Sequence, residues 1–387
     1  MVPEHCPRSF ASSWPATSPE DFCDTKLRHF RNAPSDISNQ RCVRILTLFV
    51  CAVLGALQQT ATATESQAAP GTQPRFTPVG GPNDSLSRAR SLLHDGKVND
   101  AELAVRDYLK DHVHSSDAHF LLGYVLFRKI QADAGGQSVH GVPSSGDLKS
   151  REENARASLA EYTEGAKYHH PSAFDLKIVA LNYVLLQDYP DADKWLTKSV
   201  YSDPSDSEVW YYLGRTKYNE NRFEEAITSF QHFLKLEPKS VKGEDNLGLS
   251  YQGLGNTSDA IVAYTSAIAW QDGARNQDSG PFVDLGALLL DQNQPAEAVK
   301  YLMQAVAISP EELRGHEQLG KAYDRMGQLP KAQVELEKAV ELSPQNPRLH
   351  YVLGQVYRKE GFSEKAKIEF GRSEELRRDT PSEGRNQ

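Results

Sequence analysis

The chain is poor in cysteine, and its few cysteines lie near one end. Of its 387 residues only Cys6, Cys23, Cys42 and Cys51 are cysteines. A disulfide framework, a cysteine zinc site and a covalent haem motif are therefore excluded after position 51. The sequence also has no glycine-rich phosphate loop, no G-x-S-x-G elbow and no H-E-x-x-H motif. We therefore expect no enzymatic activity, no cofactor and no small-molecule substrate.

Long runs of like charge are also missing. The chain has 43 lysines and arginines against 52 acidic residues, for a formal net charge of −9. Nucleic-acid-binding domains usually carry a basic face. We therefore expect no nucleic-acid partner.

Long apolar runs are scarce, and the one that stands out lies at residues 41–63. Arg41 and Arg44 precede an apolar run at 45–57, and small residues follow at 61–63. As a helix the run rises about 20 Å, short of the ~30 Å hydrocarbon core of a bilayer. This order predicts a secretory signal peptide, and hence an exported protein that is periplasmic, at the cell surface or secreted. The alternative is a membrane anchor formed by 45–57, the only case in which we expect membrane contact.

Three flanking segments have no helical pattern. Residues 1–40 form an irregular preface, and one hypothesis is that translation begins near Val43. Residues 64–82 are rich in Pro, Gly and Thr and predict a flexible linker. Residues 381–387 predict a polar tail.

From residue 83 onward, pairs of small residues recur twelve positions apart, and most successive pairs are 34 residues apart. The pairs are Ala89/Ala101, Ala180/Ala192, Gly214/Ala226, Gly248/Ala260, Gly286/Ala298, Gly320/Ala332 and Gly354/Ala366. Such a period indicates an internal repeat. Within 207–240, Trp210, Leu213 and Gly214 share one helical face, and Ala226 and Phe230 form the stripe of a second helix.

The pattern W-x2-L-G-x11-A-x3-F-x7-P, carried by Trp210, Leu213, Gly214, Ala226, Phe230 and Pro238, resembles the tetratricopeptide repeat family, including exported bacterial members. It fits six units in 173–380. Two divergent units occupy 83–172, with a Gly/Ser-rich insertion at 131–150 that predicts a mobile loop. The resemblance implies an all-α fold, a right-handed superhelical solenoid of about eight helix-turn-helix units.

Small and apolar residues at fixed repeat positions predict where the helices pack. A glycine inside a helix costs about 1 kcal/mol relative to alanine, so close packing must offset that cost. The predicted packing residues are Trp210, Leu213, Gly214, Ala226, Leu247, Gly248, Tyr251, Ala260, Gly286, Ala298, Gly320, Ala332, Gly354 and Ala366.

The opposite face of each first helix lines a concave, peptide-binding groove in the family that this chain resembles. On that basis the predicted groove residues are Tyr211, Arg215, Tyr218, Asn219, Arg314, Lys321, Arg325, Arg348, Tyr351 and Arg358. Their basic, tyrosine-containing character favours an acidic segment of a partner protein. The alternative is an ordinary solvated face, partly neutralised by Glu317 and Asp324.

Histidines cluster at His112, His114 and His119, which could indicate a metal site. No cysteine or acidic ligand is fixed beside them in the sequence, so we expect surface histidines and no metal.

The sequence therefore predicts a non-enzymatic protein-interaction scaffold with a protein or peptide partner. Two alternatives stay open: an accessory or regulatory subunit of an envelope enzyme or secretion machine, and a membrane-anchored protein of the same repeats.

Overall fold

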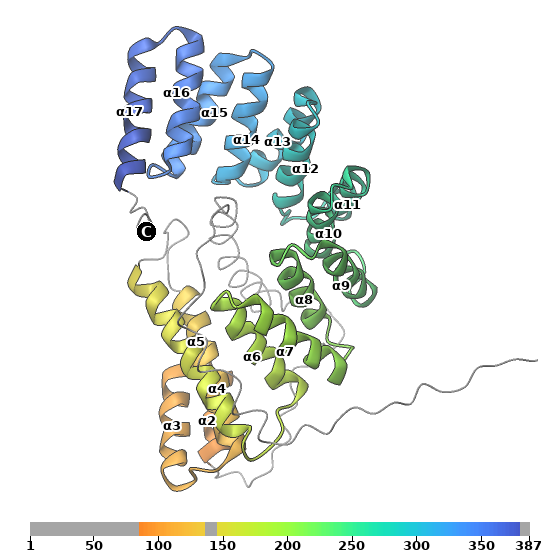
Figure 1. The fold of residues 1–387 in the computed structure, drawn as a ribbon, viewed down its shortest axis with the longest axis vertical. Helices are drawn as coiled ribbons and strands as arrows, with labels where there is room; N and C mark the ends of the chain where they lie inside the picture. Colours follow the sequence, from red (N-terminus) through yellow and green to blue (C-terminus); the bar gives the residue numbers. More distant parts are fainter. Residues whose placement is uncertain (1–84, 136–144, 380–387) are drawn as a thin grey trace, which may run out of the picture. The chain divides into compact units, whose positions relative to one another are not determined.

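The computed structural model describes residues 85–135 and 145–379, and this part consists of sixteen helices, α2 to α17, with no strand (Figure 1). The all-α prediction is confirmed. The predicted preface, signal peptide, linker and tail, at 1–40, 41–63, 64–82 and 381–387, lie outside the described residues. None of the helices in the two described ranges is both long and apolar enough to span a bilayer. The chain divides after Pro171 into two units.

The first unit contains two helix pairs. Its helices are α2 (Ser85–His94), α3 (Val98–Asp111), α4 (Ser116–Gly135) and α5 (Ser145–Gly165). In the second pair Ser158 donates a hydrogen bond to the Gly123 carbonyl (2.7 Å), because a glycine lets the two helices approach closely. Both helices run into the 131–150 insertion, where we predicted a loop. The helix-forming residues of 148–156 outweigh the nearby glycines and serines, and 136–144 lies outside the described residues.

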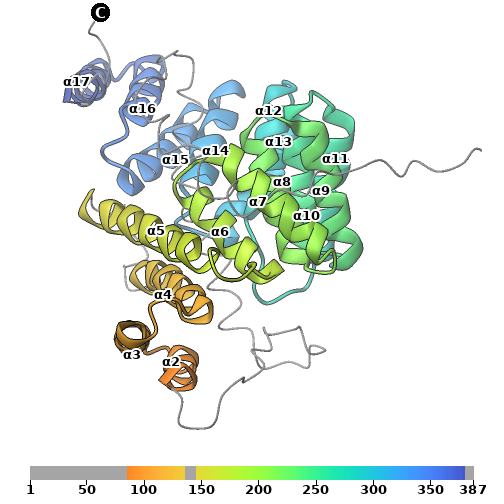
Figure 2. The ribbon, with the colours of Figure 1, turned by 60° about the horizontal axis from the view of Figure 1, so that its bottom comes forward.

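The second unit contains six helix pairs that follow one another along the chain. Its helices are α6 (Ala173–Leu185), α7 (Tyr189–Ser202), α8 (Ser207–Asn219), α9 (Phe223–Leu236), α10 (Val241–Gly253), α11 (Thr257–Trp270), α12 (Gly280–Asp291), α13 (Pro295–Ile308), α14 (Leu313–Arg325), α15 (Leu329–Leu342), α16 (Pro347–Glu360) and α17 (Ser363–Asp379). Each pair packs on the next, and Figures 1 and 2 both show α8 to α11 side by side.

In the seven helix pairs whose turns the structure describes, the turn reverses the chain in the same way, with one residue in the left-handed region. These residues are Gly96, Gln187, Asn221, Gly255, Asn293, Gly327 and Gly361. In the turn between α10 and α11, Gly255 has a φ of +83°, and the Asn256 side chain then caps α11 by accepting from the Asp259 N–H. The same backbone reversal therefore recurs in each of these seven turns.

The small residues hold the helices of a pair together. A Cβ added to Gly248 would lie 2.6 Å from the Tyr264 ring, and one added to Gly320 would lie 2.6 Å from Leu336. A Cβ added to Gly214, Gly286 or Gly354 would lie 2.8, 2.5 or 2.8 Å from Phe230, Leu302 or Phe370, respectively. Their partners twelve residues later, Ala226, Ala260, Ala298, Ala332 and Ala366, are buried. No larger side chain fits these positions without displacing a neighbour.

In several repeats, here numbered from the first residue of each 34-residue repeat, the side chain of the fourth residue bonds the first helix to the turn before it. Trp210 Nε1 donates to the Pro204 carbonyl (3.0 Å), and its ring stacks on His232. At the same position His316 and His350 donate through Nε2 to the Pro310 and Pro344 carbonyls (3.0 and 2.9 Å). We had predicted that Trp210 lies in the core. It instead links a helix to the turn before it.

The first helices of the second unit form one row. Successive first helices, α8, α10, α12 and α14, contact one another, and ion pairs extend the row to α6 and α16. In a curved stack of helix pairs, the row whose members approach one another lies on the inner side. We call the side chains that α6, α8, α10, α12, α14 and α16 present there the inner row.

Candidate functional site

Part of the inner row is covered by its own neighbours. Tyr211, which we predicted as a groove contact, is only 4% exposed, and its ring packs against Tyr212, Phe230 and Phe233. Asn219 donates to the Arg215 carbonyl of its own helix. Large aromatic rings are often buried where two helices meet, and Tyr211 is a packing residue of this kind. The prediction of an exposed contact was therefore wrong.

The predicted basic patch is largely paired within the array. Arg314 bonds to Asp284, and Arg325 donates to the carbonyl of Leu290. Lys359 contacts both oxygens of Asp324 (2.6 and 2.7 Å). The described inner row is therefore not a free basic face, because most of its cations join one repeat to the next.

Cross-repeat contacts at three junctions, α6 with α8, α8 with α10 and α14 with α16, share one arrangement, whereas where α12 meets α14 the sixth residue, Asp284, pairs with Arg314. In the shared arrangement the fifth residue of a unit faces the second residue of the next unit: Lys177 bonds to Glu208 (3.0 Å), and Lys242 lies 4.8 Å from the centre of the Tyr211 ring. Burial would lower the pKa of Lys177, but Glu208 and Asp206 outweigh it and raise that pKa. Complementary pairs of this kind connect adjacent first helices.

The shared arrangement is complete where α14 meets α16. Glu317, the fifth residue of its unit, lies 3.2 Å from Arg348, the second residue of the next unit. Lys321, four residues further along the same helix, also donates to Glu317 (2.6 Å). We call this arrangement of Glu317, Lys321 and Arg348 the closed junction.

The shared arrangement is absent where α10 meets α12. Asp245 occupies the same repeat position as Glu317, but the second residue of the next unit is Gly280 and the residue four positions along is Leu249. Within the described chain, the buried Oδ1 of Asp245 has no hydrogen-bond partner. We call Asp245, Gly280 and the nearby Asp278 and Asp284 the open junction.

Two carboxylates near Asp245, those of Asp284 and Asp278, have the same charge as its own side chain. Burial raises the pKa of Asp245 well above its ordinary value, and the carboxylates of Asp284 and Asp278 raise it further. Arg314 and Arg215 act in the opposite direction without bonding to it. Sequence reasoning missed this site, although comparing the fifth residue of each unit with the second residue of the next would have exposed the missing cation.

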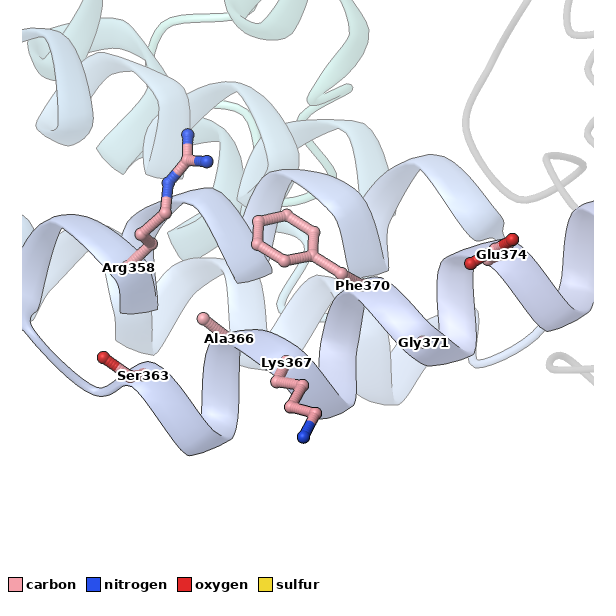
Figure 3. Close-up of a pocket in the computed structure, with 7 residues that line it drawn as sticks. All are labelled: Arg358, Ser363, Ala366, Lys367, Phe370, Gly371 and Glu374. Carbon is pink, nitrogen blue, oxygen red and sulfur yellow. The ribbon is translucent and has the colours of Figure 1, made fainter.

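The last helix pair carries the remaining predicted groove residues. Arg358 lies over the Phe370 ring at 5.6 Å, and Tyr351 packs beside the same ring. A hollow of about 470 Å³ lies here along α17, with Arg358 of α16 also lining it. Figure 3 shows Arg358 and Phe370 on one side of the hollow and the amine of Lys367 pointing the other way. Tyr351 and Arg358 thus form part of an aromatic and cationic cluster with α17.

The histidine cluster is not assembled as a metal site. His119 is buried, with Nδ1 2.7 Å from Glu161 and Nε2 3.0 Å from the Val113 carbonyl. His112 stacks on Tyr108 instead. No group of three or more potential metal-ligating side chains occurs in 85–135 or 145–379. The prediction of surface histidines was wrong for His119, which serves to connect α4 to its neighbours.

Comparison with known proteins gives matches to tetratricopeptide repeats in three places. Models of this family match residues 86–134, 207–240 and 289–356. A DnaJ homolog subfamily C member 7 homolog from Dictyostelium discoideum is 26% identical over 164 residues, covering 39% of this chain and 29% of the relative. The peroxisomal targeting signal receptor of Saccharomyces cerevisiae is 32% identical over 91 residues, covering 24% of this chain and 14% of the receptor. The chain thus spans less than a third of either relative.

A solved structure shares the fold. A tetratricopeptide repeat protein from Parabacteroides merdae aligns with a TM-score of 0.51 and 15% identity, covering 70% of this chain and 97% of that protein. The repeat period, the helix pairs and the three family matches agree. The chain is therefore a tetratricopeptide-repeat protein.

Proposed function

We propose that the chain is a non-enzymatic scaffold that binds a segment of a partner protein along the inner row. One observation carries the proposal: successive repeats present polar, charged and aromatic side chains along one continuous row of first helices, with the apolar core behind them. Stacked repeats build extended surfaces of this kind, and such surfaces suit an extended or helical segment.

The relatives support the same class of function. The yeast relative is named a peroxisomal targeting signal receptor. That name belongs to a protein of which this chain matches a small part, so the partner of this chain is proposed from its own surface.

Site-specific photocrosslinking tests the proposal. A photoreactive residue would replace Leu249 or Gln355 on the inner row, and Val262 or Val334 on exposed faces of second helices as matched controls. We expect discrete protein adducts from the two inner positions and none from the two outer positions. Adducts that form only from the outer positions would contradict the inner row as the binding surface.

We also propose that residues 41–63 direct export of the chain. Support comes from the two arginines, the short apolar run and the small residues that follow it. Fractionation with mapping of the mature N-terminus tests this, and a start near Thr64 in a soluble extracytoplasmic fraction is expected. A chain that keeps 45–57 and stays with the membrane would instead be anchored.

A further inference from the structure

We propose that Asp245 binds a cationic side chain, Lys or Arg, of the partner segment that lies along the inner row. The inference rests on the proposed function and adds the chemistry of one contact. It follows from the difference between the open junction and the closed junction.

The closed junction shows what a carboxylate at this repeat position binds. Glu317 accepts from Lys321 of its own helix and pairs with Arg348 of the next unit. Two cations therefore meet one acid, which is only 8% exposed. Burying a carboxylate is costly unless cations compensate it, and both of these cations come from the chain itself.

The open junction has the acid without either cation. Leu249 takes the place of Lys321, and Gly280 takes the place of Arg348. A Cβ built on Gly280 would lie 3.1 Å from Asp278 Oδ1 and 3.7 Å from Asp245 Oδ2, and its three nearest atoms all belong to these two residues. The space that an arginine occupies in the closed junction is therefore bordered here by two carboxylates.

The loop before α12 holds this arrangement in place. Gln271 accepts from the Asp278 N–H (2.6 Å) and donates to the Asp278 carbonyl (3.0 Å). Asp278 in turn accepts from the Gly280 N–H (2.8 Å). The second carboxylate is thus fixed beside the empty position of the missing side chain.

Nearby cations of the chain are engaged elsewhere. Arg314 is bonded to Asp284, and Arg215 lies 5.8 Å from the centre of the Tyr211 ring. The acids of the open junction are not placed as a metal site. A partner side chain with an ammonium or guanidinium group has the complementary charge and the reach to enter from the inner side.

The electrostatics reinforce the assignment. In the free protein the raised pKa of Asp245 reflects burial and two like charges. An incoming cation favours the ionised carboxylate and lowers that pKa, so binding releases a proton. Binding should therefore strengthen as pH rises toward the pKa of Asp245 in the free protein, and level off above it.

Selection from a random peptide library by the full chain tests the inference. Peptides selected by the native protein are measured by fluorescence anisotropy, each beside a version in which its Lys or Arg is replaced by Gln. Native protein, Asp245→Asn and Gly280→Arg are compared. Asp272→Asn serves as the matched control, since Asp272 is an exposed aspartate of the same loop.

We expect the selected peptides to share one cation whose loss weakens binding at least tenfold. Asp245→Asn and Gly280→Arg should abolish that dependence, and Asp272→Asn should preserve it. Selected peptides without a shared cation, or equal binding by Asp245→Asn, would overturn the assignment and leave the scaffold function standing. If the library yields no binding peptide at all, both proposals fail.

Discussion

The open and closed junctions place a carboxylate at the same position of two repeats, but the charged groups that surround it differ. Glu317 is compensated by Lys321 and Arg348, whereas Asp245 faces further acids. Most of the charge on the inner row holds neighbouring repeats together. A binding position can then arise simply because one unit omits the internal partner, without any new fold or motif.

The largest expected effect concerns the close glycine packing that lies behind both junctions. Gly248→Leu and Gly320→Leu should each lower the free energy of unfolding by about 1–3 kcal/mol, because Tyr264 and Leu336 already occupy the space. Urea denaturation of each full-length variant would measure this. A loss in only one variant would show that the packing behind the two junctions also differs.

The next prediction is that removing the acid changes the free energy of unfolding differently at the two junctions. Glu317→Gln should lower the free energy of unfolding by about 1–2 kcal/mol, because Lys321 and Arg348 lose their shared acceptor charge. Asp245→Asn should leave it unchanged or raise it by on the order of 1 kcal/mol at neutral pH, since an uncompensated buried carboxylate is removed. Equal losses in both variants would erase the distinction.

A pH series sharpens the comparison. Asp245 faces Asp284 and Asp278 as well as Arg314 and Arg215, and its pKa in the folded chain is raised. Its contribution to stability is therefore fully present below the ordinary aspartate pKa of about 4 and is lost as pH rises through the raised value. The stability of the native chain relative to Asp245→Asn should thus fall with rising pH. A difference that does not change with pH would contradict the electrostatic account.

The smallest expected effect comes from supplying the missing cation. Gly280→Arg should stabilise the array by about 0.3–1 kcal/mol more than Gly280→Gln, which controls for the helix propensity gained by removing a glycine. Repeating both substitutions in Asp245→Asn completes a double-mutant cycle. An arginine advantage that persists without the carboxylate would show that it arises elsewhere.

Much of the fold could be predicted because it repeats. Pairs such as Gly248 and Ala260 recur at a fixed spacing, and each occurrence strengthens the assignment of the others. Helix formation inside the 131–150 insertion was missed, because its glycines and serines suggested a loop while the helix formers after Leu148 extended α5.

The site was harder to predict than the fold. Arg314 and Asp284 are thirty residues apart, and only the stacking of repeats shows that they form a pair. The arginines and lysines of the predicted groove could be read from the sequence, but their pairing with acids and carbonyls depends on distances between repeats. Asp245 gave no signal of its own, because what distinguishes it is the residue that is absent opposite it.

The loop between α11 and α12, which Gln271 fixes through its hydrogen bonds to Asp278, affects how the array unfolds. In repeat proteins each unit is stabilised mainly by its neighbours, so a junction with fewer cross-links is where cooperative unfolding divides into blocks. Gln271 fixes the loop, but no hydrogen bond or ion pair between described side chains joins Asp245 of α10 to α12. We therefore expect amide exchange to separate the helices before this junction from those after it. A partner cation bound there would join the two blocks into one cooperative unit.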